Sequence, residues 1–138
     1  MVQGIKQHLA NRKRTPTSVY SFQFRGRYSF SKLFTGSDKS YGLSHPDEMI
    51  YLFYMPLFFP EFPIPSPEAE MSRLWVKFFI DFATNDLVDT DGTCFGKKCD
   101  VITFANTNNP HYPVSRTITQ GLDEDMYEFW RAFYEDRA

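Results

Sequence analysis

The residue of this sequence best suited to acid–base chemistry is His45, in the stretch YGLSHPDEMIYLF that covers residues 41–53. Glycine and serine precede the histidine, and Pro46 suits the first position of a short helix predicted over 47–54. An imidazole has an ordinary pKa of about 6.5, so it can take up and release a proton near neutral pH. A histidine held at a loop-to-helix junction is therefore a candidate general base.

The rest of the chain offers no complete partner set for His45. It contains no activated serine, no cysteine nucleophile and no second histidine at metal-ligand spacing. Asp47 and Glu48 are expected in the first helical turn, where the dipole favours acids, and residues so close in sequence cannot easily reach the ring nitrogen. We therefore assign neither as an acid partner. The same helix N-terminus would keep the imidazole neutral, and the alternative is a loop histidine that caps the helix. His8 and His111 are interpreted as surface residues.

Cys94 and Cys99 form the second group with possible chemistry. Four residues separate them in a loop that contains glycine, and the pair could close a small disulfide or remain as two free thiols. A metal site would need further ligands, and no histidine lies within ten residues of either sulfur. The sequence predicts no metal and no cofactor.

Composition limits the classes of function. The chain has 138 residues, enough for one domain with a hydrophobic core, and its aromatic content of 18% includes 15 phenylalanines. Such an excess predicts apolar surface that needs a further burial partner or an apolar ligand. The net charge of −2 argues against a nucleic-acid partner, and the run Arg12–Arg14 is interpreted as a solvated helix end. No stretch reaches transmembrane length, since Pro56 interrupts the apolar run Met49–Phe59. The first residues lack the apolar core of a signal peptide, and localisation stays open between secreted and cytoplasmic.

Hydrophobic spacing predicts the elements in chain order. They are a helix over 2–12, a strand over 19–24, a loop over 25–44, the short helix over 47–54, a proline-spaced apolar segment over 54–67, a long helix with Ser66 as its N-cap, a strand over 101–104 and a last helix opened by Asp123–Asp125. The apolar positions Met71, Leu74, Trp75, Phe78, Phe79 and Phe82 should face the core, as should Met126, Phe129, Trp130 and Phe133 of the last helix. The aromatic stretch 54–62 is expected to form a wall of the core or of an acyl pocket.

The order of these elements indicates a fold class. Two strands cannot form a self-sufficient sheet. A strand followed by a loop with a histidine is how the last part of an α/β-hydrolase looks, because the triad of that fold runs in the order serine, acid, histidine. The predicted class is therefore α/β: residues 1–138 form the C-terminal portion of one α/β-hydrolase fold, a few strands with packed helices, incomplete as an independent domain.

The segment Gly42–Glu48, GLSHPDE, resembles the Gly-Val-Ser-His-Ala-Asp-Glu/Asp motif of the type-B carboxylesterases, and Tyr51–Phe53 continue it. Residues 16–24 resemble the Pro-Val-Tyr-x-Tyr-x-Phe strand of that family, and residues 129–134 resemble its closing helix. The chain thus resembles the C-terminal part of a type-B carboxylesterase of the cholinesterase-like group, most closely insect esterases including juvenile-hormone-esterase-like enzymes. The resemblance covers nearly the whole chain, and the histidine motif is its specific part.

The resemblance implies acyl transfer from an ester to water, with His45 as general base and a small apolar ester as substrate. The serine of the family's Gly-x-Ser-x-Gly motif and the triad acid would lie before Met1, in a missing N-terminal part of the same fold. Met1 falls within a family helix, so we expect a fragment or truncated gene model that is inactive alone. Leu43 and Pro46 depart from the commoner Val and Ala beside the histidine.

Two other classes of function remain open at this point. The chain could belong to a catalytically inactive cholinesterase-like adhesion protein of the neuroligin or glutactin kind, which keeps the fold and loses the triad. Retention of His45 argues against that alternative. It could also be a self-standing binding module that uses its aromatic surface.

Overall fold

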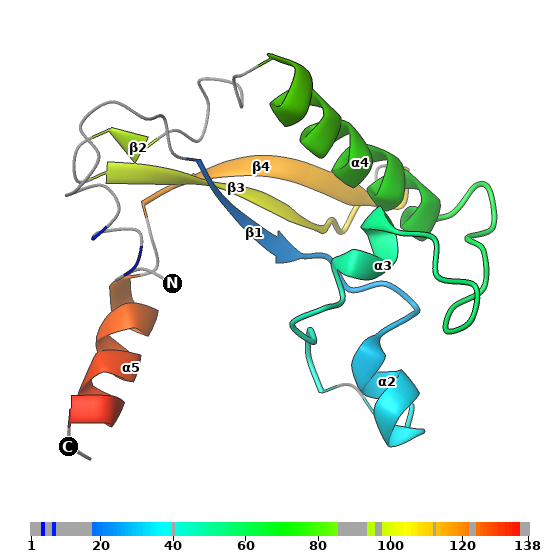
Figure 1. Cartoon of the computed structure of the whole chain (residues 1–138), viewed down its shortest axis with the longest axis horizontal. Coiled ribbons are helices and arrows are strands. Elements are labelled where there is room, and N and C mark those ends of the chain that lie inside the picture. The colour runs from blue at the N-terminus through cyan, green and yellow to red at the C-terminus, as the bar shows by residue number, and fades with distance from the viewer. Residues whose placement is uncertain are drawn as a thin grey trace. The chain divides into compact units, whose positions relative to one another are not determined.

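The computed structural model describes residues 4, 7, 18–39, 41–85, 94–95, 98–111, 113–121 and 124–135. In chain order its elements are β1 (Val19–Gln23), α2 (Phe30–Thr35), α3 (Met49–Leu52), α4 (Pro67–Asn85), β2 (Cys94–Phe95), β3 (Lys98–Asn106), β4 (Val114–Gln120) and α5 (Glu124–Glu135) (Figure 1). Most of the helix predicted over 2–12, and His8 with it, lies outside the described residues.

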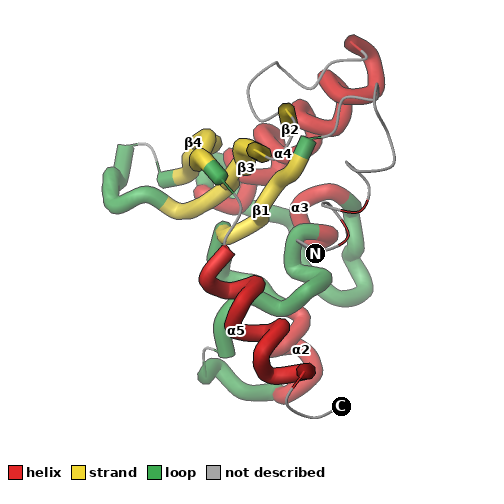
Figure 2. The backbone as a smooth tube through the Cα atoms, turned by 90° about the vertical axis from the view of Figure 1, so that its left-hand side faces the viewer, coloured by secondary structure: helices red, strands yellow, loops and turns green. Residues whose placement is uncertain are grey.

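The strands form a four-stranded sheet in which β3 is the common partner. The order is β1-β3-β2, and β4 also pairs with β3. Figure 2 shows β1, β3 and β4 running side by side. β2 and β3 are antiparallel, with Cys94 opposite Cys99 in the backbone register. The strand predicted over 19–24 is confirmed as β1, but the prediction of only two strands is wrong. β4 was not predicted because polar residues fill most of its positions, and among its residues whose burial is described only Val114 is buried.

The chain divides into two compact units, which are described separately. The first contains residues 1–20, 89–102 and 118–138. Val19 and Ile102 are its buried apolar residues among those described. Its helix α5 begins at Glu124, within the predicted opening. Phe129 and Phe133 were predicted to face inward, yet they are 60% and 38% exposed. Apolar spacing on a helix indicates which side can be buried, whereas burial itself needs an opposing surface.

The second unit contains residues 21–88 and 103–117, and α4 supplies the centre of its core. Trp75 is fully buried, with its ring 4.7 Å from that of Phe104 and 5.0 Å from that of Phe22, measured between centroids. These contacts pack the helix against side chains of β3 and β1. Phe82 was predicted to continue the buried stripe, but it is 56% exposed. It lies two turns beyond Trp75, past the rings that cover the tryptophan.

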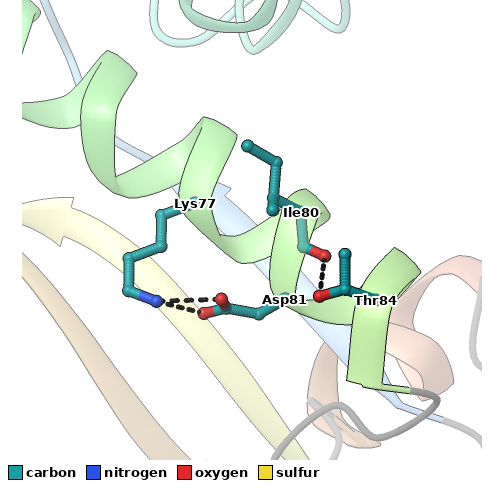
Figure 3. Close-up of polar contacts among 4 residues, drawn as sticks. All are labelled: Lys77, Ile80, Asp81 and Thr84. Atoms are coloured by element: carbon teal, nitrogen blue, oxygen red, sulfur yellow. Dashed lines mark hydrogen bonds and ion pairs between the residues drawn. The ribbon is translucent and has the colours of Figure 1, made fainter.

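Part of the exposed surface of α4 is polar. Lys77 Nζ forms an ion pair with Asp81 at 2.7 Å, and the Thr84 hydroxyl donates to the carbonyl oxygen of Ile80 at 2.8 Å (Figure 3). Both contacts join residues four apart on the helix. An exposed ion pair at this spacing contributes about 0.3–0.5 kcal/mol to stability. This side of the helix is therefore a solvated face, with Trp75 on the opposite side.

Two short helices, α2 and α3, lie in the second unit before α4, and α3 contacts α4 (Figure 1). α2 occupies part of the segment that was predicted as loop. Ser29 is its N-cap, and Gly36 ends it in the left-handed region at φ 62°, where glycine is favoured. α3 begins at Met49, later than predicted, and Pro46 lies in the turn before it instead of in its first position.

Candidate active site

His45 lies in a tight turn formed by residues 44–47. The N–H of Asp47 donates to the carbonyl oxygen of Ser44 at 3.0 Å, and the N–H of Met49 donates to that of Pro46 at the same distance. The side chain of His45 is exposed. Among the residues that the structure describes, no hydrogen bond or ion pair involves its imidazole. The turn thus presents an accessible imidazole on a backbone whose conformation is fixed by hydrogen bonds.

Asp47 closes the same turn a second time through its side chain. Its Oδ2 accepts a hydrogen bond from the N–H of Ser44 at 3.0 Å, and its Oδ1 accepts one from the N–H of Phe30 at 2.9 Å. The residue is buried, with 3% of its surface exposed. A buried carboxylate is stable only when hydrogen bonds replace its lost hydration, and these backbone donors supply them. Asp47 therefore joins the histidine turn to the start of α2.

The Ser29 hydroxyl completes the shell around Asp47. It donates to the carboxylate at 2.8 Å and 3.1 Å to the two oxygens, and its own oxygen accepts from the N–H of Ser31 at 3.1 Å. A hydroxyl carries a single proton, so the 2.8 Å contact between the Ser29 and Ser31 hydroxyls must use the proton of Ser31. Ser29 thus caps α2 and binds Asp47 at once.

Tyr51 anchors the chain that follows the turn. Its ring is buried among those of Phe24, Phe22 and Phe62, with centroid separations of 5.3, 5.5 and 5.5 Å. Its carbonyl oxygen accepts a hydrogen bond from the Ser72 hydroxyl of α4 at 2.8 Å. A Cβ atom at Gly26 would collide with the Tyr51 hydroxyl oxygen, so only glycine fits at that position. Aromatic packing and a helix contact therefore hold the residues directly after the turn.

A second buried carboxylate, Glu68, lies in the first turn of α4. Its Oε1 accepts a hydrogen bond from the N–H of Arg27 at 2.9 Å. Its Oε2 and the Tyr51 hydroxyl are both buried, and neither has a hydrogen-bond partner among the described residues. Burial raises the pKa of Tyr51 well above its ordinary value, and the negative charges of Glu68 and Asp47 add to this effect. The phenol therefore keeps its proton at a pH at which an ordinary tyrosine, with a pKa of about 10, releases it.

An apolar cavity of about 560 Å³ adjoins the residues that follow the turn. Its lining combines α3, the start of α4 and the segment 53–64, here named the aromatic loop. Phe59 of this loop is buried and Phe62 is half-buried, so these two fit the wall predicted for residues 54–62, whereas Tyr54, Leu57 and Phe58 of the same stretch are exposed. Arg73 is the cationic residue of the lining, and Tyr54 donates a hydrogen bond to Glu61 at 3.1 Å at the exposed side. The cavity can hold an apolar group of moderate size.

Comparisons with known proteins give this arrangement a context. A family model described as the carboxylesterase family matches residues 1–130. The chain belongs to the carboxylesterase family. It is also similar to a juvenile hormone esterase of Tribolium castaneum, with 33% identity over 72 residues, which is 49% of this chain and 12% of the relative. The chain therefore spans only a small part of that relative's length. No solved structure shows a significant match.

Membership of the carboxylesterase family confirms the predicted resemblance and supports ester hydrolysis at the level of the family. The sheet with its packed helices is consistent with part of the α/β-hydrolase fold that the family implies. In the described part of the chain, no group of three or more His, Cys, Asp or Glu residues could hold a metal ion. Within that part, no helix is both long enough and apolar enough to cross a membrane.

The structure corrects one expectation about His45. The helix dipole was expected to act on the imidazole directly, but α3 is a single turn of four residues that begins four positions later. So short a helix has too few aligned peptide dipoles to act strongly on the ring. Asp47 was expected in the first helical turn for the same reason, and it lies instead in the preceding turn, where Ser29, Phe30 and Ser44 bind it.

The structural role of Asp47 was not predicted from the sequence. One signal was present, because Ser44 and Asp47 have the spacing of a capping box, in which an acidic side chain bonds back to the N–H three residues earlier. No comparable signal pointed to Ser29, which lies 18 residues from Asp47 along the chain. The proximity of Tyr51, Glu68 and Gly26 also depends on tertiary packing alone.

Proposed function

We propose that this chain carries the general base of a serine carboxylesterase, and that His45 is this base. The observation that carries the proposal is the exposed His45 in a turn closed twice by Asp47, within a chain that matches the carboxylesterase family over residues 1–130. The nucleophilic serine and the triad acid would come from a preceding part of the same fold. By itself the chain is expected to catalyse no ester hydrolysis.

The mechanism requires a base that is accessible and held in place. The serine oxygen would attack the ester carbonyl while His45 accepts the hydroxyl proton, and the resulting imidazolium would pass this proton to the departing alcohol. Water would then attack the acyl-enzyme, with His45 again accepting and returning one proton. An exposed imidazole on a hydrogen-bonded turn meets the geometric requirement for both proton transfers.

The proposed substrate is a small apolar ester. The relative is called a juvenile hormone esterase, and the cavity beside α3 is lined largely by aromatic and aliphatic side chains. Burial of apolar surface in such a site supplies most of the binding free energy of an apolar ester. The aromatic loop would form part of the acyl or alcohol pocket.

The test compares the 138-residue chain with the product of the longest transcript that contains it. Hydrolysis of p-nitrophenyl acetate by the chain alone should equal the buffer blank, whereas the longer product should show turnover. The variant His45→Ala should lower kcat of the longer product by roughly 10⁴-fold or more, as expected for loss of a triad base. His111→Ala is the matched control, because this exposed histidine should leave kcat within about twofold.

Three results would contradict the proposal. The first is serine-dependent hydrolysis by the isolated chain. The second is turnover in the longer product that survives His45→Ala. The third is a transcript that encodes no further part of the fold or that replaces the nucleophilic serine by another residue. Replacement of the serine would establish the inactive, adhesion-type alternative.

A further inference from the structure

We propose that Asp47 is the positioning residue of this site: it sets the orientation of the His45 turn by locking that turn onto the segment after β1. The inference rests on the proposed role of His45 as a base. In the described part of the chain Asp47 accepts no hydrogen bond from the imidazole; its partners are the Ser29 hydroxyl and the N–H groups of Phe30 and Ser44. It therefore acts through the backbone that carries His45.

The first step is the closure of the turn from both sides. The N–H of Asp47 bonds the carbonyl oxygen of Ser44, and the carboxylate of Asp47 bonds the N–H of Ser44, both at 3.0 Å. His45 and Pro46 are thus enclosed between two hydrogen bonds that join the same pair of residues. Rotation of the His45 backbone would break one or both of them, so the direction in which the imidazole leaves the chain depends on Asp47.

The second step is the attachment to a distant segment. Ser29 and Phe30 lie 18 and 17 residues before Asp47, and both bind its carboxylate. The connection that leads from α2 to Gly42 is largely exposed, and an exposed loop cannot by itself fix the position of the turn. The carboxylate of Asp47 fixes the position of the turn, because it is buried and held by several donors. Each of its oxygens accepts a hydrogen bond from one backbone N–H, and the Ser29 hydroxyl lies within hydrogen-bond distance of both.

The position of Asp47 requires a carboxylate, because both of its oxygens must accept hydrogen bonds. Each oxygen faces a backbone N–H, Oδ1 that of Phe30 and Oδ2 that of Ser44. An asparagine has one oxygen and one NH₂ group. Whichever way its amide is turned, one backbone N–H would face a donor. Asp47→Asn therefore removes one hydrogen bond and leaves a partly buried backbone donor unpaired, although the side chain keeps its size.

The decisive experiment measures amide hydrogen exchange by NMR on the full 138-residue chain. In Asp47→Asn, at least one of the Ser44 and Phe30 amides, the one that faces the new NH₂ group, should exchange roughly 10-fold faster or more relative to the amide of Ala69, which donates to the Ser66 hydroxyl at the start of α4. A variant that merely destabilises the fold would accelerate all three amides equally. Asp38→Asn is the matched control, because it makes the same chemical change at an exposed site in the connection to the turn.

Kinetics of the longer, esterolytic product supply the second readout. Asp47→Asn should lower kcat about 10–100-fold with KM within about threefold, because the base is displaced while the pocket is kept. The acidic limb of the plot of kcat/KM against pH should also shift along the pH axis. A smaller folded fraction would lower the whole plot without shifting it.

The two proposals fail in different ways. If His45→Ala abolishes turnover while Asp47→Asn changes neither kcat nor the pH profile, the positioning role is wrong and the general-base role stands. If His45→Ala has no effect, the general-base role is wrong whatever Asp47 does. Equal acceleration of the Ser44, Phe30 and Ala69 amides would also overturn the positioning role.

Discussion

The phenol of Tyr51 lies in an environment very different from that of a free tyrosine side chain. Its hydroxyl is buried with no hydrogen-bond partner in the described part of the chain, and its pKa is raised, first by burial and then by the nearby charges of Glu68 and Asp47. The folded state therefore holds the phenolic proton at a pH at which the unfolded chain, with an ordinary tyrosine pKa of about 10, releases it. This contribution to stability is complete below about pH 10 and is lost as the pH rises further.

Tyr51→Phe tests this account. Removal of an unpaired buried hydroxyl should leave the free energy of unfolding at pH 7 unchanged or raise it by up to about 1 kcal/mol. Above pH 10 the wild-type chain should lose up to about 1.4 kcal/mol per pH unit through this one residue, and the variant should lack that loss. Urea unfolding at pH 7 and pH 11 measures both effects. The exposed Tyr41→Phe is the control, and an equal alkaline loss in the two variants would refute the assignment.

The residues of the site were only partly predictable. His45 could be singled out because its neighbours form a motif within a few positions of the chain. Asp47 was noticed and left out as an acid partner, but its buried position depends on Ser29 and Phe30, at the start of α2. A motif records neighbours in sequence, whereas a hydrogen-bond shell of this kind forms only when the tertiary fold is complete.

At the scale of elements, the start of α4 was predicted best because its signal is local. Ser66 accepts a hydrogen bond from the N–H of Ala69, and Glu68 and Glu70 follow in the first turn. Ser66→Ala should lower the free energy of unfolding by about 1 kcal/mol, because one N–H of the first turn loses its acceptor. Ser66→Asp should retain wild-type stability, since aspartate is an equally good cap. Urea unfolding measures both, and an equal loss in the two variants would exclude a capping role.

The elements that the sequence did not reveal lack such local signals. α2 is only six residues long, and its cap, Ser29, is itself held by Asp47 from a distant segment. In β4 the alternation of apolar and polar residues is weak, because the positions on the same side of the strand hold Val114, Arg116 and Ile118. The strand pairs with β3. Short helices and polar strands owe more of their stability to tertiary partners than to propensity, so single-residue patterns underestimate them.

At the scale of the whole molecule, the high aromatic content predicted apolar surface left uncovered, and the described residues show it. The aromatic loop alone exposes Phe53, Tyr54, Leu57, Phe58 and Ile64, and exposure reaches 90% at Leu57 and 89% at Ile64. Soluble monomers rarely expose large apolar patches unless another surface binds there. In the proposed enzyme, that surface would be the preceding part of the α/β-hydrolase fold or an apolar substrate.

The last prediction follows from this exposure. The isolated chain should bind an apolar dye such as anilinonaphthalene sulfonate well above the level of a typical folded monomer, because the loop offers accessible aromatic surface. Leu57→Lys combined with Ile64→Lys should reduce the dye fluorescence. The free energy of unfolding should change by less than about 0.5 kcal/mol, since neither side chain is buried in the core. Ile118→Thr, a change at an exposed position on β4, is the control and should reduce the fluorescence much less. Cooperative unfolding of a monomer that binds little dye would instead count against an esterase fragment and favour a self-standing binding module, because a fragment without the rest of its fold leaves apolar surface open to the dye.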